Sequence, residues 1–226
     1  MHMFSAGSNH TISSQIAVLS GDLIDSKRLS HAELEEAFAA LENAALEISF
    51  WQKHEGHDRT VATRFTRNRG DGWQIYLAKP TFALRAALYM RAALLAEGST
   101  LRTRIAIAEG KGDLGRGSDL NSAGGPVFVA SGGALDNMKP PVTMAHATGG
   151  ALGACVRLAD HISDDWTQAQ ARAVRGMLWP RKPTRSEVAE SLAISRQAVE
   201  QSLNAAGFGA LADAMAQIEI AAHDAS

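Results

Sequence analysis

The chain has 226 residues, 46% of them hydrophobic and 20% charged, a composition typical of globular proteins that argues against a disordered or fibrous class. Its formal net charge of -2 excludes a generally basic nucleic-acid coat, so any DNA contact must come from a local basic face. The single cysteine, Cys155, can form neither an internal disulfide nor a thiolate metal cage, and its apolar helical neighbours predict a core position.

The chain divides into three parts. A polar leader covers residues 1–15 and lacks the apolar run of a secretory signal. The length allows one domain of moderate size, predicted at 16–162, and a small appended module, predicted at 163–226. No stretch is long and apolar enough to span a bilayer, so we expect a cytoplasmic protein without a membrane partner.

The elements expected in the larger domain follow the order βαββαβ, with additions. In chain order they are a strand at 16–19, a helix from Ser30 to about Trp51, strands at 61–66 and 73–77, a helix from Pro80 to Gly98, a strand at 101–107, a helix at 127–137, a β-prone stretch at 142–144 and a helix from about Ala151. The polar run Ser20-Gly21-Asp22 is expected to stop the first strand, and Asp71-Gly72 predicts a hairpin. This order predicts a ferredoxin-like α+β fold, an antiparallel sheet with helices packed on one face.

Residues 184–206 have the pattern of a helix-turn-helix. Thr184 to Leu192 is typical of a short capped helix, Ala193-Ile194 of the turn, and Ser195 to Ala206 of a second helix that Ser195 caps. The apolar positions expected on the inner face are Val188, Ala189, Leu192, Ile194, Val199 and Leu203. An all-α helix-turn-helix domain is therefore predicted to follow the larger domain.

The outer face of this module offers side chains suited to DNA. The residues predicted to contact base edges or phosphates are Arg185, Ser195, Arg196, Gln197 and Gln201. Basic residues between 172 and 185 give the module a local positive excess, which favours DNA as its partner. The alternative that stays open is a helical hairpin used only for dimerisation.

Two short segments resemble the metal-binding pair of class III nucleotide cyclases. They are residues 20–26, Ser-Gly-Asp-Leu-Ile-Asp-Ser, and residues 68–73, Asn-Arg-Gly-Asp-Gly-Trp. Together with residues 101–107 and 125–130 they resemble the SatD family still more closely, and SatD-like proteins also have a C-terminal helix-turn-helix. The resemblance covers most of the chain and implies a cyclase-like palm domain followed by the DNA-binding module.

The resemblance implies that Asp22 and Asp71 are Mg ligands at a nucleotide site. A strand end and an adjacent hairpin can bring two carboxylates together, where a divalent metal would offset their repulsion and bind phosphate oxygens. Local chemistry offers an alternative, in which Asp22 closes an Asx-type turn and Asp71 serves the hairpin. The arginines predicted to meet nucleotide phosphates near this cleft are Arg67, Arg69, Arg102 and Arg104.

Residues that cyclases use for catalysis are missing from the matching positions. The cyclase lysine that helps to read the base corresponds to Arg67, and the asparagine and arginine that stabilise the transferring phosphoryl group correspond to Phe128 and Gly132. Because an arginine of that kind contributes strongly to phosphoryl transfer, its absence favours ligand binding without efficient turnover. The sequence therefore predicts a sensor rather than an enzyme.

As a whole, the sequence predicts a DNA-binding transcriptional regulator with a degenerate, nucleotide- and metal-binding palm. Two alternatives stay open. One is an active nucleotidyl cyclase with Asp22 and Asp71 as two-metal ligands, and the other is a structural dimerisation protein without a ligand. A homodimer is expected, because cyclase-like palms pair to complete their sites and helix-turn-helix proteins commonly read two half-sites through two-fold symmetry.

Overall fold

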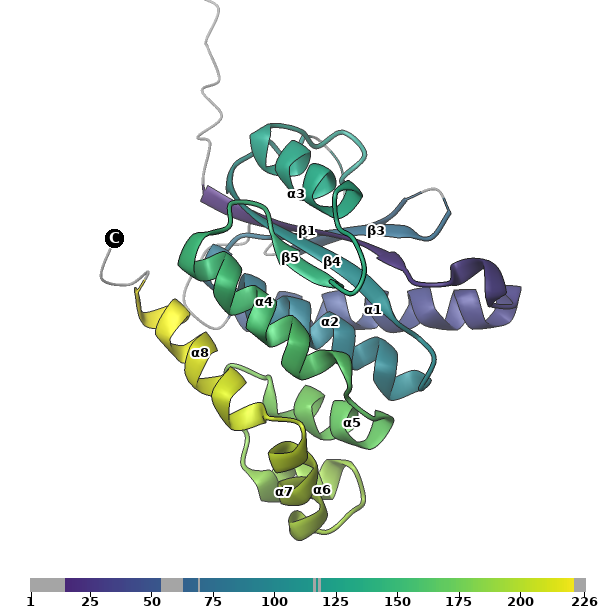
Figure 1. Cartoon of the computed structure of the whole chain (residues 1–226), viewed down its shortest axis with the longest axis vertical. Helices are drawn as coiled ribbons and strands as arrows, with labels where there is room; N and C mark the ends of the chain where they lie inside the picture. Colours follow the sequence, from purple (N-terminus) through teal and green to yellow (C-terminus); the bar gives the residue numbers. More distant parts are fainter. Residues whose placement is uncertain (1–14, 54–62, 69, 116, 118, 222–226) are drawn as a thin grey trace, which may run out of the picture.

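The computed structural model describes residues 15–53, 63–68, 70–115, 117 and 119–221. A sheet with the strand order β2-β3-β1-β4-β5 lies at its centre (Figure 1). The strands are β1 (Gln15–Leu23), β2 (Thr63–Arg67), β3 (Gly72–Leu77), β4 (Thr103–Lys111) and β5 (Met144–His146). The first four pair antiparallel in the ferredoxin-like order, and β5 adds a parallel edge strand beside β4. The predicted mixed α+β fold is confirmed.

Strand β1 continues further than its apolar run predicts. Ser20, Gly21 and Asp22 were expected to stop the strand, but all three pair with both β3 and β4. The expectation was wrong because a central strand with a neighbour on each side satisfies its backbone groups whatever its side chains are. As a result, Asp22 lies inside the sheet, opposite Gly72 on one side and Arg104 on the other.

Helices cover both faces of the sheet (Figure 1). On one face, α1 (His31–Lys53) and α2 (Ala83–Glu97) pack on a core that includes Ala17 and Leu19. On the other face, α3 (Pro126–Asp136) packs on a smaller core that includes Ile16 and Val18. Successive residues of β1 thus point to opposite cores, as the two-residue period of a strand requires. The sheet is covered on the second face as well, which the expectation of helices on one face did not include.

Helix α2 is enclosed along almost its whole length. Every residue from 83 to 96 is buried, because α2 lies between the sheet, α1 and α5 (Gln168–Met177). Two of these buried residues are charged and each has an acidic partner. Arg85 Nε lies 2.6 Å from Glu219 Oε1 of α8 (Phe208–Ala221), and Arg91 Nη2 lies 2.8 Å from Asp160 Oδ1 of α4 (Gly150–Asp164).

The C-terminal helices pack directly on the sheet domain. They are α4, α5, α6 (Arg185–Ser191), α7 (Arg196–Ala205) and α8, and α8 was not predicted. Their buried side chains belong to the same hydrophobic core as those of the sheet, with Cys155 half-buried against it. Gln168 Nε2 and Arg172 Nε both donate to the carbonyl of Ala96, which ties the start of α5 to the end of α2. The boundary predicted at residues 162 and 163 stays a prediction.

The segment 184–206 forms two capped helices joined by a tight turn. The Thr184 hydroxyl and the Glu187 carboxylate make a reciprocal capping box at the start of α6. At its end, Ala193 N–H donates to Glu190 and Ile194 N–H donates to Ala189, with Ala193 in the left-handed region at φ 53°. This is a Schellman turn with alanine in place of the usual glycine.

The second helix of this segment begins as its sequence predicts. Ser195 Oγ accepts a hydrogen bond from Ala198 N at 3.1 Å, so the predicted cap is confirmed. The predicted inner residues Val188, Ala189, Val199 and Leu203 are buried, and Leu192 is half-buried. Ile194 is 45% exposed, so its predicted inner position was wrong. The reversal of the chain at Ala193 turns the next side chain outward.

None of the helices in the described part of the chain is both long and apolar enough to cross a membrane.

Candidate functional site

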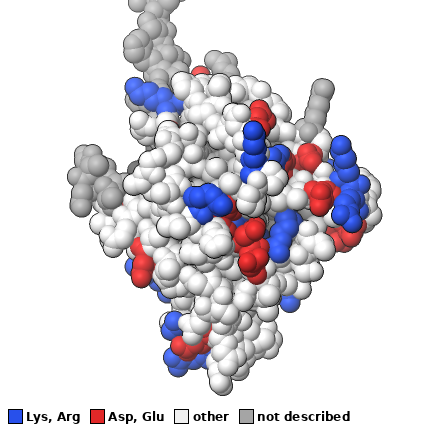
Figure 2. Space-filling model, viewed as in Figure 1, with Lys and Arg blue, Asp and Glu red and all other residues white. Residues whose placement is uncertain are grey.

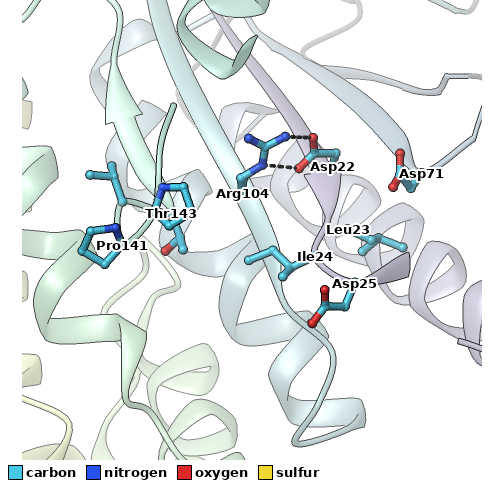
Figure 3. Close-up of a pocket in the computed structure, with 10 residues that line it drawn as sticks. Asp22, Leu23, Ile24, Asp25, Asp71, Arg104, Pro141 and Thr143 are labelled. Atoms are coloured by element: carbon cyan, nitrogen blue, oxygen red, sulfur yellow. Dashed lines mark hydrogen bonds and ion pairs between the residues drawn. The ribbon is translucent and has the colours of Figure 1, made fainter. Parts of the chain in front are cut away.

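A cavity of about 400 Å³ opens where β1 leaves the sheet (Figure 3). The residues that line it come from the end of β1 and the turn after it, from the β2–β3 hairpin, from β4, and from the segment before β5. They are Asp22, Leu23, Ile24, Asp25, Asp71, Arg104, Pro140, Pro141, Val142 and Thr143. The two carboxylates expected to form one site, Asp22 and Asp71, thus line the same cavity.

The position of Asp22 follows from the alternation of β1. Residues 16, 18 and 20 face α3, where Ser20 Oγ donates to Ser131 Oγ at 2.9 Å. Asp22 points to the same side, one step further along the strand, and it is only partly buried. Its carboxylate therefore lies at the rim of the α3 layer, where the cavity begins.

The Asp22 carboxylate is already held by a cation of the chain itself. Arg104 Nε donates to Asp22 Oδ1 at 2.9 Å, and Arg104 Nη2 donates to Asp22 Oδ2 (Figure 3). The hydrogen bond to Asp22, followed by the attraction of its charge, raises the pKa of Arg104. Arg104 Nη1 also reaches the carbonyl of Met138 at 3.4 Å, which fixes the guanidinium in place. Such a two-point pair is the strong form of an arginine–carboxylate contact.

The second carboxylate also has a local partner. Asp71 Oδ2 accepts a hydrogen bond from the Ser26 hydroxyl, and the Asp71 carbonyl accepts one from the N–H of Leu23 at 3.1 Å. These contacts hold the hairpin against the end of β1. Asp25, the third carboxylate of the cavity, is exposed in a left-handed conformation at φ 54°.

The side chains that line the cavity do not fit the magnesium centre that the cyclase resemblance implies. Magnesium requires near-octahedral coordination by oxygens, and both oxygens of Asp22 are bonded to Arg104. In the part of the chain that the structure describes, no three acidic, histidine or cysteine side chains come together as a metal site. A metal at Asp22 would first have to displace a guanidinium.

The predicted phosphate-contacting arginines are dispersed. Arg67 pairs with Glu35 at 2.8 Å and lies 3.8 Å from the ring centre of Phe38, on the α1 face of the sheet. Arg102 lies just before β4 and does not line the cavity, and its Nη1 is buried with no hydrogen-bond partner in the part of the chain that the structure describes. Arg69 lies outside the described residues. Of the three predicted arginines that the structure describes, Arg104 alone reaches the cavity, and there it faces a carboxylate.

One wall of the cavity was missed by sequence reasoning. The segment from Pro140 to Thr143 includes a cis peptide bond between the two prolines and is held from behind by α4. The Thr143 N–H donates to Asp160 Oδ2 at 3.0 Å, and its hydroxyl donates to Asp160 Oδ1 at 2.6 Å. The proline pair was visible in the sequence only as a break before a strand, and nothing in it pointed to Asp160.

The residues predicted to contact DNA share one exposed end of the molecule. Figure 1 places α6 and α7 at the end farthest from the sheet. Val199 and Leu203 are buried on the inner face of α7, which packs on α5 and α6. The side chains that remain outside are those of Arg185, Ser195, Arg196, Gln197 and Gln201, all of which are exposed.

This end has charges of both signs (Figure 2). Arg181 Nη1 lies 3.0 Å from Glu187 Oε1, so part of the expected positive excess is paired within the module. Hydrogen bonds from the Thr184 backbone and from Arg181 lower the pKa of Glu187 to about 2, which keeps it ionised. Arg185 and Arg196 belong to no ion pair among the described residues.

Comparison with known proteins gives likeness to solved structures only at a distance. No protein-family model matches the chain, and no curated protein matches it either. A solved structure described as that of a bacterial light-regulated adenylyl cyclase aligns with 59% of this chain and 75% of its own, with 18% sequence identity and a TM-score of 0.41. So distant an alignment brings no activity and no residue roles to this chain. The resemblance to the SatD family stays a prediction.

The Asp22–Arg104 pair predicts how the cavity responds to a metal probe. Replacing Arg104 by glutamine frees the Asp22 carboxylate beside Asp25 and Asp71. We expect Mn²⁺ to bind the Arg104→Gln variant more tightly than the wild type, by about tenfold or more, because a unit charge a few ångströms away is removed. Calorimetric titration measures the difference. Adding Asp22→Asn should restore weak binding, and equal affinities in wild type and Arg104→Gln would contradict the expectation.

Proposed function

We propose that this chain is a DNA-binding transcriptional regulator whose sheet domain senses a ligand without turning it over. The observation that carries the proposal is the exposed first turn of α7, which lies behind a tight turn and is capped by Ser195. In helix-turn-helix proteins the first turn of the second helix enters the major groove. Arg196 and Gln197 occupy that turn here, and both are of types that hydrogen-bond base edges.

The arrangement of the three helices supports this role more than that of a simple helical hairpin. Helix α7 packs on both α5 and α6, and α6 approaches α5 closely enough that a Cβ on Gly176 would lie 2.8 Å from Val188 Cγ1. The inner face of α7 is therefore fully used within the chain. Its polar face is the part left for a partner, and a polar, amide- and arginine-bearing helix suits DNA better than a protein interface core.

Ligand sensing is the role proposed for the sheet domain. Its cavity is lined by three carboxylates and the Arg104 guanidinium, an arrangement without a free cation to stabilise a transferring phosphoryl group. The positions where the cyclase resemblance requires an asparagine and an arginine are Phe128 and Gly132. These features support ligand binding over an active cyclase. In the proposal, a homodimer places two α7 helices on the two halves of a DNA site.

Replacing Arg196 by alanine should weaken DNA binding. A bidentate contact to a base edge contributes about 1–3 kcal/mol of discrimination, so Arg196→Ala should lose that much on a selected site and relax specificity there. Fluorescence anisotropy with duplexes selected from a random pool, repeated over a salt series, measures both effects. A phosphate contact would instead weaken every sequence alike and flatten the salt dependence.

A matched control is available at the other end of the chain. Arg28 is an exposed arginine in the short 3₁₀ turn after β1, outside the helices α5, α6 and α7, and Arg28→Ala should leave DNA binding unchanged. Light scattering of the same samples checks the dimer. If wild type binds no sequence from the pool more tightly than random duplex, or if Arg196→Ala and Arg28→Ala behave alike, α7 does not read DNA.

A further inference from the structure

A second cavity, of about 350 Å³, lies where the C-terminal helices meet α1 and α2. Its apolar wall includes Tyr89 of α2, Trp179 just after α5, and Leu192, the residue that ends α6. Ligand cavities in proteins commonly measure about 300–1,000 Å³ and combine apolar walls with a few placed polar groups. The size of this cavity suits a small-molecule ligand.

The aromatic wall is held rigidly from behind. Trp51 of α1 meets Tyr89 edge-on, with 4.8 Å between ring centres, and lies 6.1 Å from Trp179. Trp51 is 4% exposed, and its Nε1 is buried with no hydrogen-bond partner among the described residues. Burial and the hydrogen bond to Glu47 raise the pKa of Tyr89 to about 12, so its ring stays uncharged. Tyr89 and Trp51 are buried and support Trp179, whose half-buried ring is an aromatic surface that favours a planar apolar group.

Some charged groups of this cavity are bonded to other side chains, and others are available to a ligand. The Arg175 guanidinium is already bonded within the chain, because its Nη2 donates to Glu47 at 2.9 Å and its Nε reaches the Tyr89 hydroxyl at 3.5 Å. Arg172 donates through Nε to the Ala96 carbonyl at 3.2 Å, and no hydrogen bond from its two terminal nitrogens occurs within the described residues. Glu97 is 54% exposed, with one long contact of 3.8 Å to Arg175. The cavity thus presents one available guanidinium and one available carboxylate that are not paired with each other.

From this arrangement we propose that the cavity binds a small zwitterion with a planar apolar group, of the chemical class of a free aromatic amino acid. The ligand carboxylate meets the terminal nitrogens of Arg172, its ammonium group meets Glu97, and its ring lies against the half-buried Trp179. A nucleotide does not suit the site, since two carboxylates balance the two guanidinium groups and leave no positive excess for phosphates.

The position of the cavity couples it to the C-terminal helices. Leu192 is both a lining residue and the C-cap of α6, directly before the turn that leads into α7. Gly176, which also lines the cavity, is the point where α5 lies against Val188 of α6. A ligand here touches α2, α5 and the end of α6 at once, and it can therefore favour one placement of α6 and α7 over another. Ligand binding itself does not depend on whether α7 reads DNA.

Calorimetry on the full chain without DNA tests the proposal. The probes are L-phenylalanine, L-tyrosine and L-tryptophan, with glycine, phenylalanine amide and N-acetylphenylalanine as analogues that lack the ring, the carboxylate or the ammonium group. We expect at least one aromatic amino acid to bind and glycine not to bind. Blocking either charged end should weaken binding by about tenfold or more, the usual effect of losing a hydrogen bond to a charged group.

Variants of the chain assign the contacts. Arg172→Gln and Glu97→Gln should each weaken binding of the same probe by about tenfold, and Arg28→Gln should leave it unchanged. Glu97 is exposed, so its variant keeps the fold even if Arg172→Gln loosens the junction of α2 and α5. Absence of binding by all three amino acids, or equal affinity for free and blocked phenylalanine, overturns the proposal. Neither result bears on DNA binding, which is measured separately.

Discussion

A Gly21→Ala variant is expected to lose about 3 kcal/mol of unfolding free energy, the upper end of what overpacking a core usually costs. A Cβ at this position would lie 2.3 Å from Trp73 Cζ2 and 2.6 Å from the carbonyl oxygen of Arg104. Neither neighbour can move easily. Trp73 is fully buried and its Nε1 donates to the Thr103 hydroxyl at 3.0 Å, while the Arg104 carbonyl belongs to the central strand pair.

Urea unfolding of purified protein measures this loss, with Gly132→Ala as the matched control. Gly132 lies inside α3, and a Cβ there would meet nothing within 4 Å. That variant should be neutral or up to about 1 kcal/mol more stable, because alanine is the better helix former. If Gly21→Ala unfolds within about 0.5 kcal/mol of wild type, the central strands adapt more freely than their packing indicates.

Gly21 also shows where the sequence was and was not informative about the fold. Apolar runs and periodicity predicted the βαββαβ order, because each of those elements has a local apolar pattern that can be recognised without its neighbours in the fold. The end of β1 was wrong, because a glycine between two polar residues is typical of a turn when only near neighbours are considered. The reason for the glycine is the indole of Trp73, which is far away in sequence and crosses the strand at that point.

The candidate site, too, could be predicted from the sequence only in part. The strand end and the hairpin that bring Asp22 and Asp71 to one cavity are local features, so their meeting could be predicted. The partner of Asp22 could not, because the direction of Arg104 depends on the register between β1 and β4. Arg67 looked equivalent to Arg104 in the sequence, yet strand alternation sends it to the opposite face of the sheet. Helix α8 was missed because small and apolar residues occupy both its buried and its exposed side, so its sequence shows little helical amphipathicity.

Replacing Arg91 by methionine should cost about 3 kcal/mol of unfolding free energy, because it removes the buried charge partner of Asp160 and leaves that carboxylate paired with Arg157, whose side chain is 44% exposed. The Arg91 and Asp160 side chains are 5% and 2% exposed, and Arg91 Nη2 bonds both Asp160 Oδ1 and the Thr143 hydroxyl at 2.8 Å. The pair joins α2 to α4 and also holds the Thr143 wall of the first cavity. The same variant should therefore loosen that wall as well as lower the stability of the chain.

A second replacement and a pH series separate lost charge from lost packing. Asp160→Asn keeps an acceptor for the Thr143 N–H and removes the buried charge that Arg157 compensates only from the surface, so the double variant should regain about 1–3 kcal/mol over Arg91→Met alone. In wild type, burial raises the Asp160 pKa, but hydrogen bonds from Thr143 and the charge of Arg91 outweigh burial and hold that pKa below its ordinary 3.8. A lowered folded-state pKa contributes stability that is complete above the ordinary value and is lost as the pH falls through the folded one. In Arg91→Met the charge and the hydrogen bond of Arg91 no longer oppose burial and the Asp160 pKa rises, so acid relieves the penalty. The difference in stability between wild type and Arg91→Met should accordingly shrink from pH 7 toward pH 4, and a difference that stays constant would assign the loss to packing alone.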